Sequence, residues 1–365
     1  MIMKIKFLFA TLLAAITFAS CSNDDGTNVV PAGQPAKMSV TIKQPTRVRA
    51  IGAAATTDQT ITTFTVWIFN ADGTLAATAT ASDGSDKIEN IEVTTSATDA
   101  YVIANCDQST VTGITTKQAL LDYVGNLANT ANQTAARWAT GKNATALTFT
   151  PADGTYEGSA TIALDFIAAR ITVKIVNGMT GYDATAGDGS LVLEKVAVLN
   201  AGGTSKLFDT SLIPTTKTWI SGIADNSFEY WPTANVTVDG TLLSNDIPAD
   251  DFTTTYHYYA FENDATSPEN SPTIVTLVGE YDGAKTYFPV HLAPYETFKT
   301  GDVADGVKRG HSYDITITLK TDPTIGGDEG GGGETDPTKP AVAKAKFDVE
   351  ISINDWIPVT LEKEF

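Results

Sequence analysis

Cysteine is almost absent from this sequence, which has only two in 365 residues, Cys21 and Cys106. If Cys21 is used for another purpose, Cys106 stands alone and no disulfide can form within the chain. The folded protein must then be stabilised by burial of apolar side chains rather than by covalent cross-links.

Positive charge is also scarce. The chain has 24 Lys and Arg against 43 Asp and Glu, which gives a formal net charge of −19 and a pI near 4.4. Nucleic-acid binding needs a basic patch and docking on anionic membranes needs basic clusters, so this composition argues against both. A solvated, self-repelling outer surface is the simplest interpretation of the acidic excess.

Groups that carry out chemistry are few. The three histidines, His257, His291 and His311, have no motif partner, and nothing supports a Ser-His-Asp site. The segment DGSD, residues 83–86, lacks the full spacing of a calcium loop and is typical of a turn. We therefore predict no catalytic, cofactor-binding or metal-binding residues, no cofactor and no enzymatic activity.

Short strands are what the sequence has in quantity. Hydrophobic residues make up 42% of the chain and charged residues 18%, and threonine, which favours strands, recurs throughout. Short alternating runs separated by turn signals indicate antiparallel β-sandwiches, and the length suffices for two domains. The clearest predicted strands are residues 61–69, 75–81, 88–93, 100–106, 191–200, 256–261, 273–278, 286–292 and 312–319.

One helix is expected to interrupt the strands. The sequence TTKQ, residues 115–118, fits a capping box in which Gln118 reaches back to the cap. A stripe of apolar residues at helical spacing follows and predicts a helix packed on the core. The stripe consists of Leu120, Leu121, Val124 and Leu127.

The apolar run at residues 161–176, TIALDFIAARITVKIV, is long for one strand. It is interpreted as two strands, or as one strand that bends. Arg170 and Lys174 share a strand face, which we expect to be solvated or to hold a local ion pair with Asp165. The weakly patterned segment 209–218 is expected to hold the boundary between the two domains.

The N-terminus has the pattern of an export signal. Two lysines precede an apolar segment, residues 7–19, which has the length of a signal-peptide core and is too short for a membrane span. Ala19 and Ser20 before Cys21 resemble a bacterial lipobox, the signal for lipidation of that cysteine, with Phe18 where leucine is usual. An ordinary signal peptide with an incidental cysteine is the alternative.

The stretch AKMSVTIKQPTRVRA, residues 36–50, predicts a strand with one buried face, and a proline then ends its ladder. An arginine-specific protease that cut between Arg49 and Ala50 would remove this strand and open an apolar groove. Arg47 is a competing cut site. We therefore interpret the chain as a precursor that can polymerise after the cut. The apolar residues of the removable strand are Met38, Val40 and Ile42.

The C-terminus carries a possible replacement for that strand. Residues 321–340 are Gly-rich and predict a flexible linker; the following Lys-Ser/Thr and helix of a phosphate loop are lacking. The two strands predicted after the linker have unpaired edges, which invite pairing with another chain, and their alternation matches that of the first strand. The predicted donor residues are Phe347, Val349, Ile351, Ile353, Ile357, Val359 and Leu361.

Taken in order, these segments resemble the fimbrillin family, the FimA-type major subunits of type V pili. The resemblance rests on the lipobox, the TRVRA junction, and the stretches FTVWIFNADG, AYVIANC, LDFIAARITVKI, YYAFEND, TYFPVHL, VKRGHSYDITITL and NDWIPVTLEKEF. It implies an all-β fold of two transthyretin-like β-sandwich domains in tandem. One short helix in the N-terminal domain and a flexible C-terminal strand pair complete the expected architecture.

The resemblance also implies how the chain is processed. Members are exported as lipoproteins, matured by an arginine-specific protease, and polymerised by strand exchange, in which a neighbour's C-terminal strands fill the vacated groove. The expected segments are a lipoprotein signal peptide (1–21), a propeptide with the removable strand (22–49), an N-terminal sandwich (50–210), a C-terminal sandwich (211–320), the linker (321–340) and the donor strands (341–365).

The function implied is that of a stalk subunit of a cell-surface fimbria that supports adhesion, since both the cut site and the C-terminal strands are present. Expected partners are further copies of the chain in a head-to-tail polymer, related tip and anchor pilins, the protease, and the outer membrane through the lipid of the precursor. The alternative is a monomeric surface lipoprotein or tip-type pilin that binds host glycan or protein.

Overall fold

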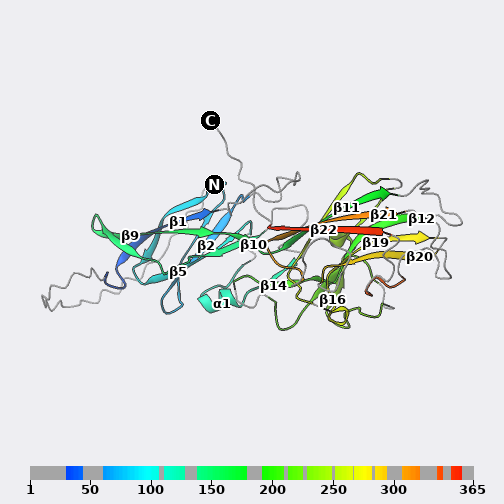
Figure 1. The fold of residues 1–365 in the computed structure, drawn as a ribbon. Helices are drawn as coiled ribbons and strands as arrows, with labels where there is room; N and C mark the ends of the chain where they lie inside the picture. The colour runs from blue at the N-terminus through cyan, green and yellow to red at the C-terminus, as the bar shows by residue number, and fades with distance from the viewer. Residues whose placement is uncertain are drawn as a thin grey trace, which may run out of the picture.

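The computed structural model describes residues 30–43, 61–106, 111–127, 138–178, 191–208, 213–224, 228–248, 251–265, 267–281, 284–293, 306–320, 335–339 and 347–355. Strands dominate these residues, so the predicted all-β fold is confirmed. Figure 1 shows an elongated molecule in which the strands of the first half lie at one end and those of the second half at the other. The short helices are α1 (Lys117–Leu121), α3 (Gly240–Leu243) and the 3-10 turn η2 (Pro268–Asn270).

Two sheets build the first half of the molecule. Their buried residues belong to one continuous core cluster, so the sheets pack as a sandwich. In sheet order, the first consists of β4 (Lys87–Thr94), β1 (Pro35–Lys43), β9 (Thr155–Ala163) and β8 (Phe149–Ala152). The second consists of β10 (Asp165–Phe166), β7 (Ala139–Lys142), β5 (Ala97–Ala104), β2 (Phe64–Asn70) and β3 (Leu75–Ala81).

Two further sheets build the second half in the same way. In sheet order, the first consists of β18 (Thr255–Ala260), β11 (Ala169–Gly178), β21 (His311–Lys320) and β22 (Phe347–Asp355). The second consists of β17 (Ser244–Asp246), β12 (Leu191–Leu199), β19 (Ile274–Tyr281) and β20 (Ala284–His291). Alternation predicted β12, β19, β20 and β21 well, because these strands bury apolar side chains in the core.

Small elements join the two halves. A two-stranded sheet pairs β6 (Val124–Asn126) of the first half with β14 (Thr204–Lys206) of the second. The Tyr101 and Phe208 rings meet edge to face with centroids 5.0 Å apart, and Thr140 Oγ1 donates to the Leu207 carbonyl at 3.4 Å. A three-stranded sheet lies beside them, with β13 (Ala201–Gly202), β15 (Trp219–Ser221) and β16 (Val236–Val238).

The sheets do not follow the predicted boundary between residues 210 and 211. Strands β11 and β12 precede that boundary, yet β11 pairs with β18 and β21, and β12 pairs with β17 and β19. The chain therefore passes from the first sandwich to the second between β10 and β11, at residues 167–168. The long apolar run at 161–176 divides into strands that belong to different halves.

Two local predictions need correction. The helix stops at Leu121 because β6 then pairs with β14; Thr116 does cap it, accepting from Ala119 N at 3.2 Å, but Gln118 binds Asp122 instead of reaching back. Arg170 is buried rather than solvated, with 7% of its surface exposed.

The partners of Arg170 are not those expected. Its Nε donates to Ser312 Oγ at 3.2 Å, and its Nη2 lies 4.0 Å from Asp314 Oδ1, so its contacts are with β21 and not with Asp165. Lys174, on the same strand, is exposed as predicted.

Candidate functional site

The strand β1 lies inside its sheet, between β4 and β9. It pairs antiparallel with β4 from Pro35 to Thr41 and parallel with β9 from Ala36 to Lys43. The main-chain N–H and C=O groups on both edges of β1 are therefore paired with neighbouring strands. If β1 were removed, β4 and β9 would each present a row of unpaired N–H and C=O groups to an incoming strand.

One face of β1 fills the core of the first sandwich. Met38 and Val40 are fully buried, and Ala36 and Ile42 are each 4% exposed, while Lys37 and Lys43 lie in solvent. This is the alternation that the sequence predicted for Met38, Val40 and Ile42. An empty β1 position would leave an apolar groove lined by the side chains that these residues now contact.

Gly158 of β9 forms a niche in the wall of this groove. It is the register partner of Met38. A Cβ atom at this position would come within 2.9 Å of the Phe149 ring and 3.0 Å of Met38 Sδ, so a side chain here would displace its neighbours. Sequence reasoning did not single out Gly158, although a glycine inside a strand is a signal for close approach.

Both ends of β1 are tied by hydrogen bonds beyond its ladder. Before the strand, Thr95 N donates to the Gln34 carbonyl at 2.9 Å, and Thr155 Oγ1 donates to the Pro35 carbonyl at 3.1 Å. At the other end, Ile42 N donates to the Asp86 carbonyl at 2.8 Å. The strand is therefore held along its whole length, and cutting the chain after it would not by itself release it.

The strand β22 is placed differently. It pairs antiparallel with β21 from Phe347 to Asp355 and ends its sheet. The sequence suggested unpaired strands on a leash, but this strand lies against its own C-terminal sandwich (Figure 1). The four apolar donor positions of β22 are the register partners of Leu319, Ile317, Ile315 and Tyr313, all of which are buried.

Several predicted site residues lie outside the described residues. These are the lipidation residue Cys21, the cleavage residues Arg47, Arg49 and Ala50, and the donor residues Ile357, Val359 and Leu361. The described site is therefore the groove around β1 together with the docked strand β22.

The three histidines have separate structural contacts. His257 Nδ1 lies 3.3 Å from Thr172 Oγ1, His291 Nε2 lies 3.2 Å from the carbonyl of Thr338, and His311 Nδ1 lies 2.9 Å from the carbonyl of Arg309. Among the described residues, no group of three or more His, Cys, Asp or Glu is placed to hold a metal ion. In the same part of the chain, no helix is long and apolar enough to cross a membrane.

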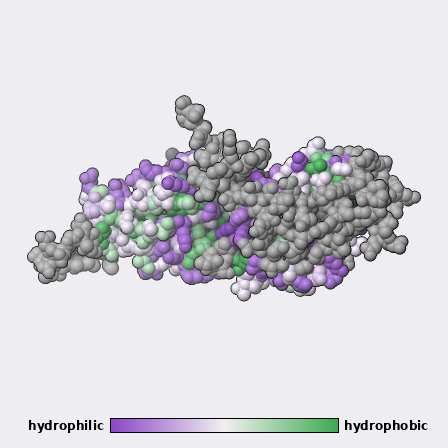
Figure 2. Space-filling view, in the orientation of Figure 1, coloured by the Kyte–Doolittle hydropathy of each residue, from purple (hydrophilic) through white to green (hydrophobic). Residues whose placement is uncertain are grey.

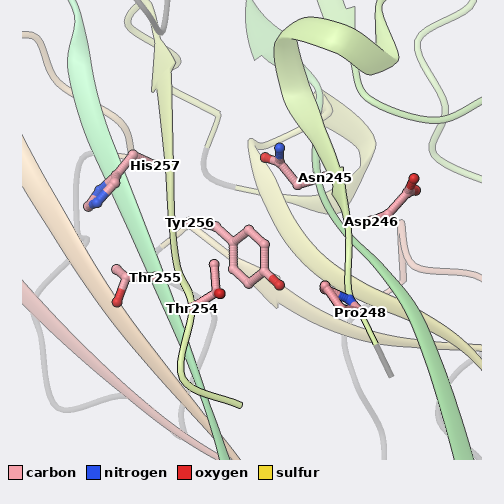
Figure 3. Close-up of a pocket in the computed structure, with 7 residues that line it drawn as sticks. All are labelled: Asn245, Asp246, Pro248, Thr254, Thr255, Tyr256 and His257. Atoms are coloured by element: carbon pink, nitrogen blue, oxygen red, sulfur yellow. The ribbon is translucent and has the colours of Figure 1, made fainter. Parts of the chain in front are cut away.

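A hollow of about 440 Å³ opens between β17 and the start of β18 (Figure 3). The Tyr256 side chain is 5% exposed, and its hydroxyl has no hydrogen-bond partner. His257 points to the opposite side of β18 from Asp246, so the imidazole and the carboxylate do not meet. The hollow is lined by Asn245, Asp246, Pro248, Thr254, Thr255, Tyr256 and His257.

A partly buried ion pair stands at the junction of the two halves. Arg309 Nε lies 3.4 Å from Glu262 Oε1, and the same guanidinium donates to the Leu207 carbonyl at 3.1 Å and to Ser205 Oγ at 2.9 Å. Burial raises the pKa of Glu262, and the charge of Arg309 partly opposes that rise. Through these hydrogen bonds, Arg309 links β14 and the residue that follows it to the loop before β21.

The surface between these sites is mixed. Hydrophilic and hydrophobic residues are intermixed over the described part of the face in Figure 2. The geometry thus defines a tandem β-sandwich protein whose candidate site consists of strand pairing and an apolar groove rather than of reactive side chains.

The chain belongs to the FimA-like major fimbrial subunit family. The family model for the C-terminal domain of FimA-like major fimbrial subunit proteins matches residues 168–356, and the model for the major fimbrial subunit protein FimA matches residues 36–195. Proteins of this family are subunits of cell-surface fimbriae. No curated protein matches the chain.

Solved structures show the same architecture. A candidate cell adhesion protein from Bacteroides eggerthii has 25% identity and a TM-score of 0.71, with 91% of this chain and 98% of that chain covered. A fimbrilin, FimA, from Porphyromonas gingivalis has 19% identity and a TM-score of 0.66, with 90% and 99% covered. The tip fimbrial protein Mfa3 from the same species, with C-terminal truncation, has 14% identity and a TM-score of 0.50, with 88% and 100% covered.

Proposed function

We propose that this protein is a stalk subunit of a fimbria and that it polymerises by strand exchange. Cleavage at Arg49 separates β1 from the rest of the chain, and the C-terminal strands of a neighbouring copy then take its place between β4 and β9. The observation that carries the proposal is the position of β1, the first strand in the described part of the chain, which lies inside a sheet and is followed in the sequence by an arginine-containing segment.

The groove and the donor strand match in pattern. The groove accepts four apolar side chains at every second position, now those of Ala36, Met38, Val40 and Ile42. The strand β22 offers apolar residues at four such positions, and it already forms a ladder at a sheet edge. A donor that entered parallel to β9 and antiparallel to β4 would satisfy both exposed edges.

The burial of apolar side chains favours a long-lived polymer. Burial of Met38, Val40 and Ile42 is worth about 1.5–3 kcal/mol for each side chain, or on the order of 5–9 kcal/mol before entropic costs. A donor strand with apolar residues of similar size recovers this burial free energy and also restores the main-chain hydrogen bonds to β4 and β9. Dissociation would expose the same surface again, so the proposed polymer dissociates slowly.

The proposed maturation begins before the strand is cut. The precursor is exported, lipidated at Cys21 and held at the outer membrane until an arginine-specific protease acts. Its partners are further copies of itself and related tip and anchor pilins. The Arg49–Ala50 junction is the proposed cut, with Arg47 as the competing site.

The test uses chain that begins at Gly26 and a limiting amount of arginine-specific protease, followed by intact mass and electron microscopy. We expect a product that begins at Ala50, together with filaments or an SDS-resistant ladder. The variant Arg49→Lys should remain uncut at that junction, whereas Arg47→Lys should be processed normally. Deletion of residues 347–365 should abolish filaments without preventing the cut. Cut chain that stays monomeric under all conditions would contradict the stalk role.

A further inference from the structure

Residues 335–339, which precede β22 in the sequence, form a compact, partly buried turn, which we call the strap. Thr338 is fully buried and Pro337 is buried as well, although the surrounding sequence predicted a flexible linker. Asp336 Oδ1 accepts hydrogen bonds from Thr338 N at 2.9 Å and from Thr338 Oγ1 at 2.6 Å. An aspartate followed two residues later by its own donor is typical of an Asx turn, so the strap has a defined shape of its own.

The strap is bound to the body of the second sandwich. Glu229 N donates to Asp336 Oδ2 at 2.8 Å, and Tyr230 N donates to Thr338 Oγ1 at 3.1 Å. On the other side, the Thr338 carbonyl lies 3.2 Å from His291 Nε2, at the end of β20. These contacts hold the strap from two directions, and none of them involves β22.

The loop under the strap is itself well packed. The Phe228 ring meets the rings of Trp231 and Tyr287 edge to face, at centroid distances of 6.0 and 5.4 Å. An ion pair between Lys339 Nζ and Glu229 Oε2, at 2.6 Å, adds a contact at the surface. The strap therefore rests on a supported loop rather than on a free surface segment.

We propose that the strap is the fixed root of the C-terminal arm, residues 340–365, and that it stays bound when the arm leaves β21. The proposal rests on the proposed function, which supplies the reason for the arm to move. Its basis is a difference in attachment. Among the described strands, β22 has one neighbour, β21, whereas the strap has separate contacts with the loop at 229–230 and with β20.

A fixed root limits how far the arm can reach. Seven residues, 340–346, join the strap to β22, and they span at most about 25 Å. If the root were instead the end of β21, the connecting residues would be 321–346 and would span about 90 Å. The strap therefore determines how close the neighbour's groove must lie, and through that distance it sets the spacing and stiffness of the polymer.

The first test asks whether the strap stays in place when β22 is released. In the full monomeric chain, Ile351→Asp puts a charge opposite the buried Ile315. Measured residue by residue, hydrogen exchange should rise about tenfold or more for the β21 amides that face β22, while the amides of Glu229, Tyr230 and Thr338 keep their rates within about twofold. If these three amides accelerate together with β21, the strap and the arm are one unit and the proposal is wrong.

The second test releases the strap alone. Asp336→Ala removes three accepted hydrogen bonds, so the amides of Glu229, Tyr230 and Thr338 should exchange about tenfold faster or more. The matched control is Asp264→Ala, which removes an equal charge from an exposed ion pair with Lys217 in the same half of the chain. Unchanged exchange in Asp336→Ala would overturn the proposal.

The third test concerns the polymer. Filaments of processed Asp336→Ala should still form, with a persistence length several-fold shorter than in wild-type and in Asp264→Ala filaments. Filaments of unchanged stiffness would overturn the positioning role of the strap. If the wild-type chain forms no filaments, the proposed function fails, and the exchange measurements on the monomer still decide whether the strap is a separate root.

Discussion

The strands β1 and β22 carry the same pattern of apolar residues, but the fold holds them in different ways. The strand β1 is paired on both sides and tied at both ends, whereas β22 lies at the edge of its sheet and pairs with β21 alone in the part of the chain that the structure describes. An edge strand can leave without disturbing the rest of its sheet, and an interior strand cannot. If the proposed strand exchange takes place, the two strands must be released in different ways: β1 by a cut followed by a competing strand, and β22 by a binding site that it prefers to the edge of its own sheet.

The largest effect should come from a charge placed in the interior strand. Val40→Asp introduces a carboxylate at a fully buried position and should destabilise the precursor by about 4 kcal/mol or more. Ile351→Asp in β22 should have a far smaller effect, because the arm can undock without unfolding either sandwich. Urea unfolding of both variants measures the difference. Thr41→Asp, on the other face of β1, is the control, and equal losses for β1 and β22 would break the comparison.

The next effect concerns the link between the two halves. Arg309→Ala leaves the partly buried Glu262 without its counter-charge and should cost about 3 kcal/mol at neutral pH, the low end for a buried pair. The pKa of Glu262 is already raised by burial. A carboxyl group with a raised pKa stabilises the folded protein fully at low pH, and this stabilisation is lost as the pH rises through the pKa of the folded state. The loss of unfolding free energy in Arg309→Ala should therefore become smaller on acidification.

The matched experiment is the double variant Arg309→Met with Glu262→Gln, which removes both charges and should recover much of the loss. Denaturant titrations near pH 4 and pH 7 measure both effects. A deficit that is independent of pH would mean that Glu262 does not titrate as its burial implies.

A smaller effect should come from the niche in the groove. Gly158→Ala adds one carbon where Phe149 and Met38 already make close contact, and it should cost about 1–3 kcal/mol in the precursor. The same substitution should slow polymerisation of the cut chain, because the donor must fit the same niche. Ser159→Ala on the same strand is the control. If Gly158→Ala polymerises at the wild-type rate, the donor does not occupy the register of Met38.

The smallest effect should come from the loop before β18, whose contribution to stability depends on pH in the acid range. The pKa of Asp251 is lowered to about 2 because its carboxylate accepts hydrogen bonds from Thr254 and Thr253. A carboxylate whose pKa is lowered in the folded protein stabilises the fold at pH values above its ordinary pKa of 3.8, and this stabilisation is lost as the pH falls toward about 2. Asp251→Asn should therefore lower the melting temperature slightly at pH 5 and match wild type below pH 2. A difference that persists in acid would contradict this cause.

Local pattern was sufficient to place many of the strands, because a strand such as β1 or β21 buries one face and the alternation of its residues records that face directly. Strands β1, β12 and β21 lie within a residue or two of their predicted bounds. Which strands pair with one another was harder to predict. The two residues between β10 and β11 look like a bend within one strand, yet they separate two sandwiches, since the partners of β11 lie about 90 and 140 residues further along the chain.

Tertiary contacts also overrode local signals at the candidate site. The leucine stripe after Thr116 predicted a longer helix, but pairing of β6 with β14 ends it. The Gly-rich context concealed the strap, whose Asp336 and Thr338 form a turn that a motif search for Asx turns would find. The groove at β1 was predicted from Met38, Val40 and Ile42, whereas the niche at Gly158 depends on a strand that lies far away in sequence.

The most direct test of the account uses chain cut at Arg49 whose own arm carries Ile351→Asp. A synthetic peptide of residues 345–365 is added, and native mass spectrometry follows the bound segments. The account predicts that the segment before Ala50 stays bound after cleavage, and that the peptide then displaces it with one copy per groove. Retention of the segment at saturating peptide, with no peptide bound, would show that the C-terminal strands do not replace β1.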